Sequence, residues 1–270
     1  MSDILADMDN DPGPTVQVNF TLDTGPCRLD ASAAVPASET NLTQLLPVLQ
    51  DLSSSIIGST VQIVEREGYS ISCRAGCGAC CRQLIPLSIF EAEFLAGWIR
   101  TLPEARQSEL TARFDAALIQ LRDAGLLARM DPSVRVQGSP EEKTLAIEYL
   151  RQRVACPFLE NESCSIHPIR PLICREYLVT SPPENCVDPS VYPVVGVPIP
   201  LKLSHVLFDL GAQVDPDSGG WMPLVFLFAW MRMRGGHPGQ AVTAPGPELL
   251  HEIVKRLVKS AEADATATTS

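Results

Sequence analysis

The sequence predicts a mainly α, helical single-domain protein with an irregular cysteine-rich segment and a small N-terminal β-hairpin. Apolar residues recur at helical spacing through most of the 270-residue chain, and one alternating stretch stands near the N-terminus. Prolines crowd the segment from 156 to 200, where long regular elements are therefore not expected. A hydrophobic content of 45% is sufficient to bury a core.

Residues 1–37 are expected to form an N-terminal extension. Within it, residues 16–22 alternate between apolar and polar side chains as a half-buried strand does, and a turn at 23–26 would close a hairpin. The first twelve residues lack the basic start and apolar core of a secretory signal, so we expect a cytoplasmic location and reduced thiols. Cys27, alone in this region, is interpreted as a buried or unpaired thiol.

Residues 38–262 are expected to form the helical domain. Its first helix runs from about 42 to 68, and Pro47 should begin or kink it. The next begins at the capping box Ser88-Ile-Phe-Glu91. Another runs from Pro103 to Gly125, a residue placed to end it.

Two further helices complete the domain. Ser139-Pro-Glu-Glu142 resembles a helix start, and its helix ends just before Cys156. The last helix has one apolar face between Leu249 and Val258. Residues 263–270 are expected to be a disordered tail.

Charge and hydropathy exclude some partners. The net charge of −11 and the lack of a basic patch argue against nucleic acid and anionic membranes as partners. The longest apolar run, residues 221–230, is well short of the roughly 20 residues that span a bilayer. We interpret it as core, and its exposure would instead favour a site for a protein partner.

Eight of the nine cysteines fall in two groups. In a reducing compartment, clustered thiols coordinate metal, and the competing chemistry is disulfide bonding. Soft thiolates select zinc, copper(I) or iron–sulfur clusters, and eight thiols equal two tetrahedral sites. The candidate metal ligands are Cys73, Cys77, Cys80 and Cys81, followed by Cys156, Cys164, Cys174 and Cys186.

The residues around these cysteines suit a metal site. Gly76 and Gly78 let the backbone curl tightly beside Cys77 and Cys80, which have the two-residue gap of a zinc knuckle. Nearby cations would counter the negative charge of thiolate ligands. Two residues separate His167 from Cys164, and His167 is left open as an alternative ligand. The candidate cations are Arg74, Arg82, Arg170 and Arg175.

The cysteine pattern resembles a known family. It is similar to the pattern of the YkgJ-type cysteine-cluster family, which is labelled by its CxxCxxCC motif. The stretches that carry the likeness are Cys73–Cys81, Cys156-Pro-Phe-Leu and Cys164-Ser-Ile-His-Pro-Ile-Arg-Pro-Leu-Ile-Cys174-Arg. The likeness covers residues 73 to about 186. The gap between Cys73 and Cys77 is three residues where the family label has two. The resemblance implies chelation of zinc or iron but implies no particular reaction.

Three hypotheses for the function follow. We favour a cysteine-ligated zinc, iron or iron–sulfur protein with a structural, storage, delivery or sensing role and no catalytic residues, because a cysteine-only zinc site has no open position. The alternative is an S-adenosylmethionine-dependent protein methyltransferase with an iron–sulfur cluster, similar to flagellin lysine N-methylases. A radical variant is disfavoured because Ala79 stands where an aromatic is usual. The third hypothesis is an interaction module in which zinc only holds together a helical scaffold that binds a protein partner.

Overall fold

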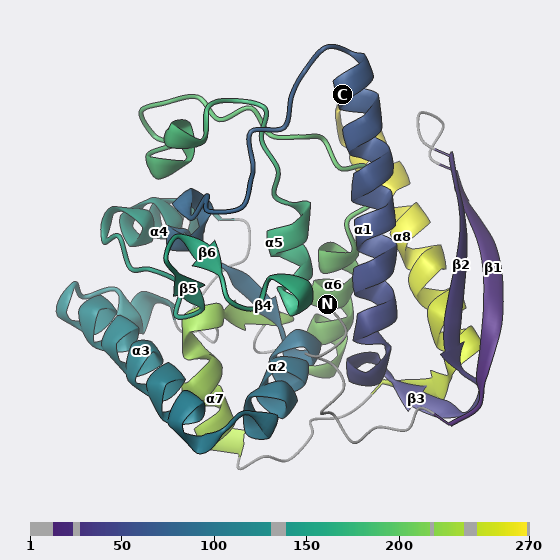
Figure 1. Cartoon of the computed structure of the whole chain (residues 1–270), viewed down its shortest axis with the longest axis horizontal. Coiled ribbons are helices and arrows are strands. Elements are labelled where there is room, and N and C mark those ends of the chain that lie inside the picture. The colour runs from purple at the N-terminus through teal and green to yellow at the C-terminus, as the bar shows by residue number, and fades with distance from the viewer. Residues whose placement is uncertain (1–12, 24–27, 131–138, 217–218, 235–241, 269–270) are drawn as a thin grey trace.

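The computed structural model describes residues 13–23, 28–130, 139–216, 219–234 and 242–268 (Figure 1). Helices dominate these ranges, which confirms the mainly α fold class. The α-helices are α1 (Leu42–Arg66), α2 (Ile89–Thr101), α3 (Glu104–Asp123), α4 (Pro140–Arg151), α5 (Leu172–Glu176), α6 (Leu203–Val214), α7 (Leu227–Arg234) and α8 (Gly246–Thr268).

The strands are short and pair two by two. Apart from the first pair, each has only two or three residues. They are β1 (Thr15–Asp23) with β2 (Arg28–Pro36), β3 (Glu39–Asn41) with β8 (Thr243–Pro245), β4 (Pro86–Ser88) with β7 (Trp221–Pro223), and β5 (Leu159–Glu160) with β6 (Ser163–Cys164), all antiparallel.

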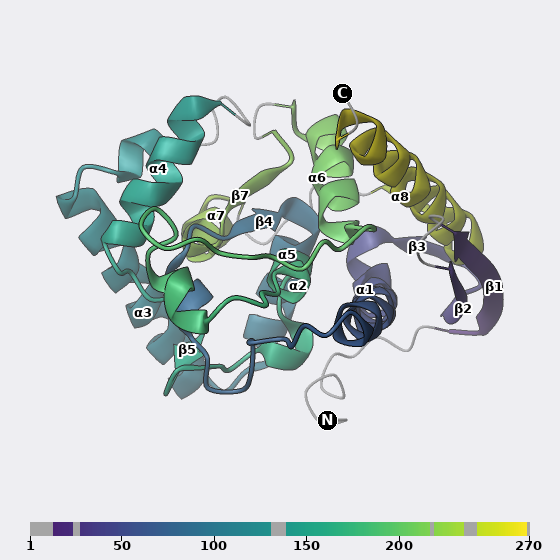
Figure 2. The same cartoon turned by 90° about the horizontal axis from the view of Figure 1, so that it is seen from above.

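The predicted N-terminal hairpin is confirmed. β1 and β2 pair from Thr15 opposite Pro36 to Asp23 opposite Arg28. The hairpin packs on α8 and α1, and Leu22 and Val35 are fully buried there. Figures 1 and 2 both place the hairpin and α8 at one end of the molecule, with α3 and α4 at the other. Residues 24–27, including Cys27, lie outside the described ranges.

Local capping explains where several helices begin and end. The Ser88 hydroxyl accepts from the Glu91 amide (3.2 Å) and the Glu91 carboxylate accepts from the Ser88 amide (3.1 Å), so the predicted capping box of α2 is confirmed. Ser139 caps α4 as predicted. Gly125 ends α3 as predicted, with φ +72° and its amide bonded to the Arg122 carbonyl.

One helix begins where it was predicted to begin, and another continues further than predicted. α1 begins before Pro47, because Asn41 and Gln44 form a capping box that fixes its start at Leu42. Pro47 therefore lies inside α1 instead of beginning it. At the other end of the chain, α8 continues to Thr268, into the expected disordered tail. Alanine has the highest helix propensity, and the four alanines from Ala261 to Ala267 favour the extension.

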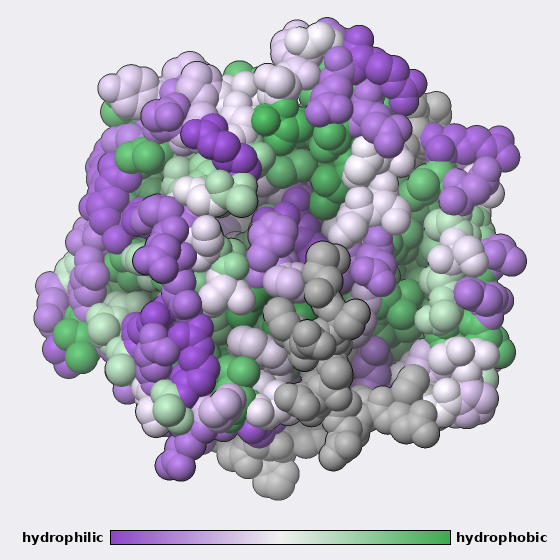
Figure 3. Space-filling view, in the orientation of Figure 1, coloured by the Kyte–Doolittle hydropathy of each residue, from purple (hydrophilic) through white to green (hydrophobic). Residues whose placement is uncertain are grey.

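The apolar run at 221–230 belongs to the core. It forms β7, a 3-10 turn at Leu224–Phe226 and the start of α7, and Leu227 is fully buried. The exposed surface that would favour a protein partner there is not seen. Within the described ranges, every helix is too short or too polar to cross a membrane. Figure 3 shows hydrophilic residues over most of one face, with hydrophobic residues between them.

Two packed clusters hold the molecule together. The larger joins the buried faces of α1, α2, α6 and α8. The smaller lies between α3 and α4 and includes Leu121, Leu145, Tyr149 and Val225. The cysteine-rich segments lie between α1 and α4 in Figure 1, in contact with both clusters.

Candidate metal centre

Seven of the predicted cysteine ligands line one cavity of about 520 Å³. The cavity lies between the first cysteine segment, the β5–β6 hairpin and α5, so residues from the first and the second cysteine groups meet in space. All eight described cysteines are free thiols, so the competing disulfide chemistry is not seen among them. The seven that line the cavity are Cys73, Cys77, Cys80, Cys81, Cys156, Cys164 and Cys174.

Cys186, the eighth predicted ligand, is placed differently. It is buried in a 3-10 turn at Pro183–Val187 and does not line the cavity. Its side chain is hydrogen-bonded to that of Tyr177, whose hydroxyl also accepts from Gln83 Nε2 at 3.3 Å. Tyr177 itself lines the cavity. The turn that carries Cys186 packs against the 3-10 turn at Ala79–Arg82, and burial, followed by the charges of Cys80, Cys73 and Cys77, raises the pKa of Cys186. Cys186 therefore lies next to the first cysteine segment without lining the cavity. The sequence analysis did not single out Tyr177.

The first cysteine segment is a tight loop that leads into a 3-10 turn at Ala79–Arg82 (η1). The Cys77 amide donates to the Arg74 carbonyl (3.1 Å), and Gly76 has φ +81°, a conformation that glycine adopts without strain. This curl brings four sulfurs to one wall of the cavity. The Cys156 amide then donates to the Cys81 carbonyl at 2.7 Å, which joins the first cysteine segment directly to the second.

The β5–β6 hairpin positions Cys164. Its two-residue turn, Asn161 and Glu162, has φ +49° and +59°, the positive values of a type I′ turn. The turn sets Cys164 opposite Leu159. The hairpin is held from α3, because Arg113 donates to Glu160 at 3.0 Å and Arg106 also pairs with Glu160.

Helix α5 positions Cys174, and buried carboxyl groups hold both of its ends. Glu91 of α2 accepts from the amide of Leu172, the first residue of α5, at 2.7 Å. At the other end, Glu176 accepts from the Ser204 amide of α6 at 3.1 Å. The sequence analysis identified Glu91 only as a cap of its own helix; the contact with Leu172 gave no sequence signal because 81 positions separate the two residues.

Burial strongly disfavours charge on these thiols. It is the main cause of the raised pKa of Cys73, Cys164 and Cys174, and it raises the pKa of Cys156 to about 12. Negative charge on Cys80 adds to the rise in all four. Without a cation the thiols therefore hold their protons, and a bound metal ion would displace them.

Cys80 differs from its neighbours. The adjacent Cys81 thiol donates a hydrogen bond to Cys80, which lowers the pKa of Cys80 and raises that of Cys81. Cys80 is thus the thiol that ionises most readily in this pair. Backbone amides support further sulfurs, because Val179 donates to Cys73, Phe158 to Cys156 and Ile166 to Cys164.

The four arginines expected to counter thiolate charge differ in their positions relative to the cavity and in their hydrogen-bond partners. Arg170 lines the cavity, and its charge opposes the burial that raises the pKa of Cys73, Cys164 and Cys174. Its Nε is buried with no hydrogen-bond partner in the described structure. Arg175 hydrogen-bonds to the Arg170 carbonyl (3.1 Å) and to Ser54 (3.2 Å). Arg74 also lines the cavity, and Arg82 pairs with Glu162.

His167 lines the same cavity from an exposed position. Burial, followed by the charges of Arg170 and Arg175, lowers its pKa, so the imidazole is neutral at pH 7, the form that binds metal. Its ligation stays a prediction. As the described side chains stand, no three of the His, Cys, Asp and Glu residues form a group that could hold one ion. The sulfurs are instead spread around the cavity.

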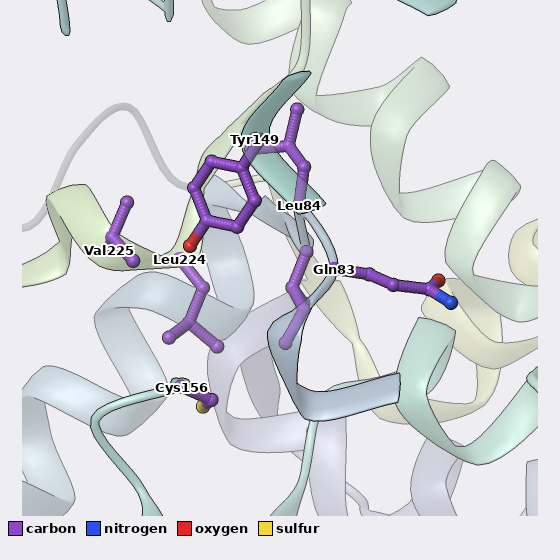
Figure 4. Close-up of a pocket in the computed structure, with 7 residues that line it drawn as sticks. Gln83, Leu84, Tyr149, Cys156, Leu224 and Val225 are labelled. Atoms are coloured by element: carbon purple, nitrogen blue, oxygen red, sulfur yellow. The ribbon is translucent and has the colours of Figure 1, made fainter. Parts of the chain in front are cut away.

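The back of the cavity near Cys156 is closed by the smaller cluster. Figure 4 shows Tyr149, Leu84, Leu224 and Val225 on one side, with the Gln83 side chain extending away from Tyr149. Burial, and next the charge of Cys156, raises the pKa of Tyr149, so its phenol stays neutral. The sulfur of Cys156 therefore has an uncharged environment behind it.

The donor set fits a soft cation. Seven thiols share one cavity with the guanidinium of Arg170, whose Nε is buried, and thiolates are ligands for zinc and for iron in iron–sulfur clusters. Residues 72–190 match the CxxCxxCC family model, described as "Putative zinc- or iron-chelating domain". The match covers less than half of the chain, and we refer to the matched segment as the CxxCxxCC domain. The resemblance seen in the sequence is thereby confirmed, and the CxxCxxCC domain has a description that supports metal binding in general.

The other two comparisons add nothing to this identification. No curated protein and no solved structure matches the chain. The methyltransferase alternative therefore gains no support from relatives. A cytoplasmic location, a protein partner and the exclusion of nucleic acid stay predictions.

Proposed function

We propose that the CxxCxxCC domain binds zinc or iron through cysteine thiolates, and that the metal is structural. The observation that supports this most is the meeting of seven sulfurs, from segments that begin at Cys73 and Cys156, around one cavity. Cys80 is the first ligand we assign, because it ionises most readily in the Cys80–Cys81 pair. Cys186, which is hydrogen-bonded to Tyr177 beside the cavity, is assigned a supporting position.

A structural role accounts for the low content of regular structure from 156 to 200. In this part of the described chain, the longest elements have five residues. Ordering the backbone costs about 1–2 kcal/mol per residue in conformational entropy, and a segment with so little regular structure offsets only a small part of that cost. Structural zinc contributes about 10–16 kcal/mol in small zinc peptides, enough to order a segment of this kind.

The residues at the site have three roles: they bind the metal, compensate the charge of the thiolates and orient the sulfurs. Thiolates from both cysteine segments hold the metal, which when bound supplies the positive charge that replaces the thiol protons. Arg170 compensates the remaining negative charge, and the Val179, Phe158 and Ile166 amides orient three sulfurs. Storage, delivery and sensing use the same ligands but require faster metal exchange than a structural site does.

The proposal is tested by metal content in matched variants. We expect Cys80→Ser and Cys174→Ser to lower the zinc or iron content, and to speed amide hydrogen exchange from 156 to 186. Cys27→Ser should change neither, because Cys27 is outside both cysteine groups. Metal content equal to that of the unmodified protein in both cavity variants would refute the ligand assignment.

A further inference from the structure

An ion pair links the two cysteine segments at the edge of the cavity. Arg82 directly follows Cys81, and Glu162 precedes Cys164 in the β5–β6 turn. Arg82 Nη2 donates to Glu162 Oε1 at 2.6 Å and Nη1 donates to Glu162 Oε2 at 2.9 Å. The pair is bidentate, the strongest geometry for this combination of side chains. Arg82 Nη1 also donates to the Gly78 carbonyl at 2.9 Å.

The backbone around Glu162 shows that this contact is specific. Glu162 has φ +59°, a left-handed conformation that costs a non-glycine residue about 1 kcal/mol or more. It also packs directly against Gly78. A Cβ on Gly78 would collide with Glu162 Oε2, and would lie 3.0 Å from Leu159 Cδ1 and 3.3 Å from Glu162 Cα. The turn conformation and the close approach to Gly78 together place Glu162 beside Arg82.

The charges explain what the pair does for the cavity. Glu162 lines the cavity, where an unpaired carboxylate would repel thiolates. Pairing with Arg82 neutralises it and holds the pKa of Glu162 below its ordinary value. The side chains of Arg82 and Glu162 keep 25% and 53% of their area exposed, and Glu162 lines the cavity, so the pair lies where the cavity meets the protein surface.

We propose that Arg82 and Glu162 form a latch across the cavity rim, and that this latch sets how slowly bound metal leaves. Both are positioning residues, because they act through the cysteine segments that they join. The inference rests on the proposed function, since a latch has a role only if the cavity holds metal. Opening the pair would free the β5–β6 turn, with Cys164, from the loop that carries Cys77 and Cys80.

The test is the rate at which zinc-loaded full-length protein transfers zinc to excess 4-(2-pyridylazo)resorcinol, followed by absorbance. We expect Glu162→Gln and Arg82→Met to release zinc about fivefold faster, the factor that corresponds to an ion pair at the upper end of the range for exposed pairs. Arg82→Lys, which keeps the charge but loses the bidentate geometry, should give an intermediate rate. The double variant Arg82→Glu/Glu162→Arg should recover much of the slow rate.

Arg129→Met and Glu148→Gln are the matched controls. These residues form an ion pair between the 3-10 turn Leu127–Met130 and α4, and neither lines the cavity. Their variants should release zinc at the unmodified rate. Release rates of the latch variants equal to those of the controls, at full zinc loading, would overturn the latch alone. Absence of zinc from the unmodified protein would instead refute the proposed function.

Discussion

Replacing Glu91 with alanine should destabilise both α2 and the helix that carries Cys174. Glu91 is buried, and its carboxylate accepts from the Ser88 hydroxyl (2.7 Å), the Ser88 amide (3.1 Å) and the Leu172 amide (2.7 Å). Truncation leaves these three buried donors without their acceptor, at about 1 kcal/mol or more each. We therefore expect a loss of about 3 kcal/mol in the free energy of unfolding.

For a chain of this size, such a loss lowers Tm by about 6–12 °C. Thermal unfolding followed by circular dichroism measures it. Glu93→Ala is the control, because Glu93 lies on the same helix and is only partly buried, and its carboxylate accepts a hydrogen bond from the Thr43 hydroxyl (3.1 Å). Its Tm should fall by much less. A Tm for Glu91→Ala equal to that of Glu93→Ala would refute the role of Glu91 as a buried link between α2 and α5.

Three further predictions concern pH and glycines. Burial raises the pKa of Glu91 above its ordinary value of 4.5, so folded protein binds its proton more tightly and stability should fall as pH rises from about 4.5 through the raised pKa. Glu91→Gln should flatten this slope in urea unfolding at several pH values. Gly78→Ala should speed zinc release, because its Cβ would collide with Glu162 and disturb the latch. Gly58→Ala, in open space on α1, should raise the free energy of unfolding by about 0.5–1 kcal/mol. Gly125→Ala should lower Tm without changing zinc content, because alanine strains the φ of +72° at the end of α3; an unchanged Tm would contradict this.

Features that depend on neighbouring residues could be predicted from the sequence. The Ser88–Glu91 box and the Gly125 helix end act within three or four positions, and their residue types specify the geometry. The apolar pattern also predicted the start of α1 near residue 42, although the Asn41–Gln44 box that fixes it was not singled out. The gathering of the cysteines was expected from thiol chemistry, and seven of the eight do line one cavity.

Contacts between distant segments could not be predicted in the same way. Arg82 and Glu162 are 80 positions apart, and neither residue lies in a sequence motif that indicates which residue it contacts. The β4–β7 and β3–β8 pairs have only three residues each, too few for an alternation to show. Tyr177, which is hydrogen-bonded to Cys186 and lines the cavity, was missed for the same reason.

The most direct measurement is elemental analysis of freshly purified, unmodified protein, combined with titration of its free thiols. We expect zinc or iron at one or more ions per chain, with most cavity thiols protected from modification until the metal is removed by a chelator. Protein that is free of both metals after expression in medium that contains them, and whose cavity thiols all react at once, would contradict a thiolate-bound metal centre.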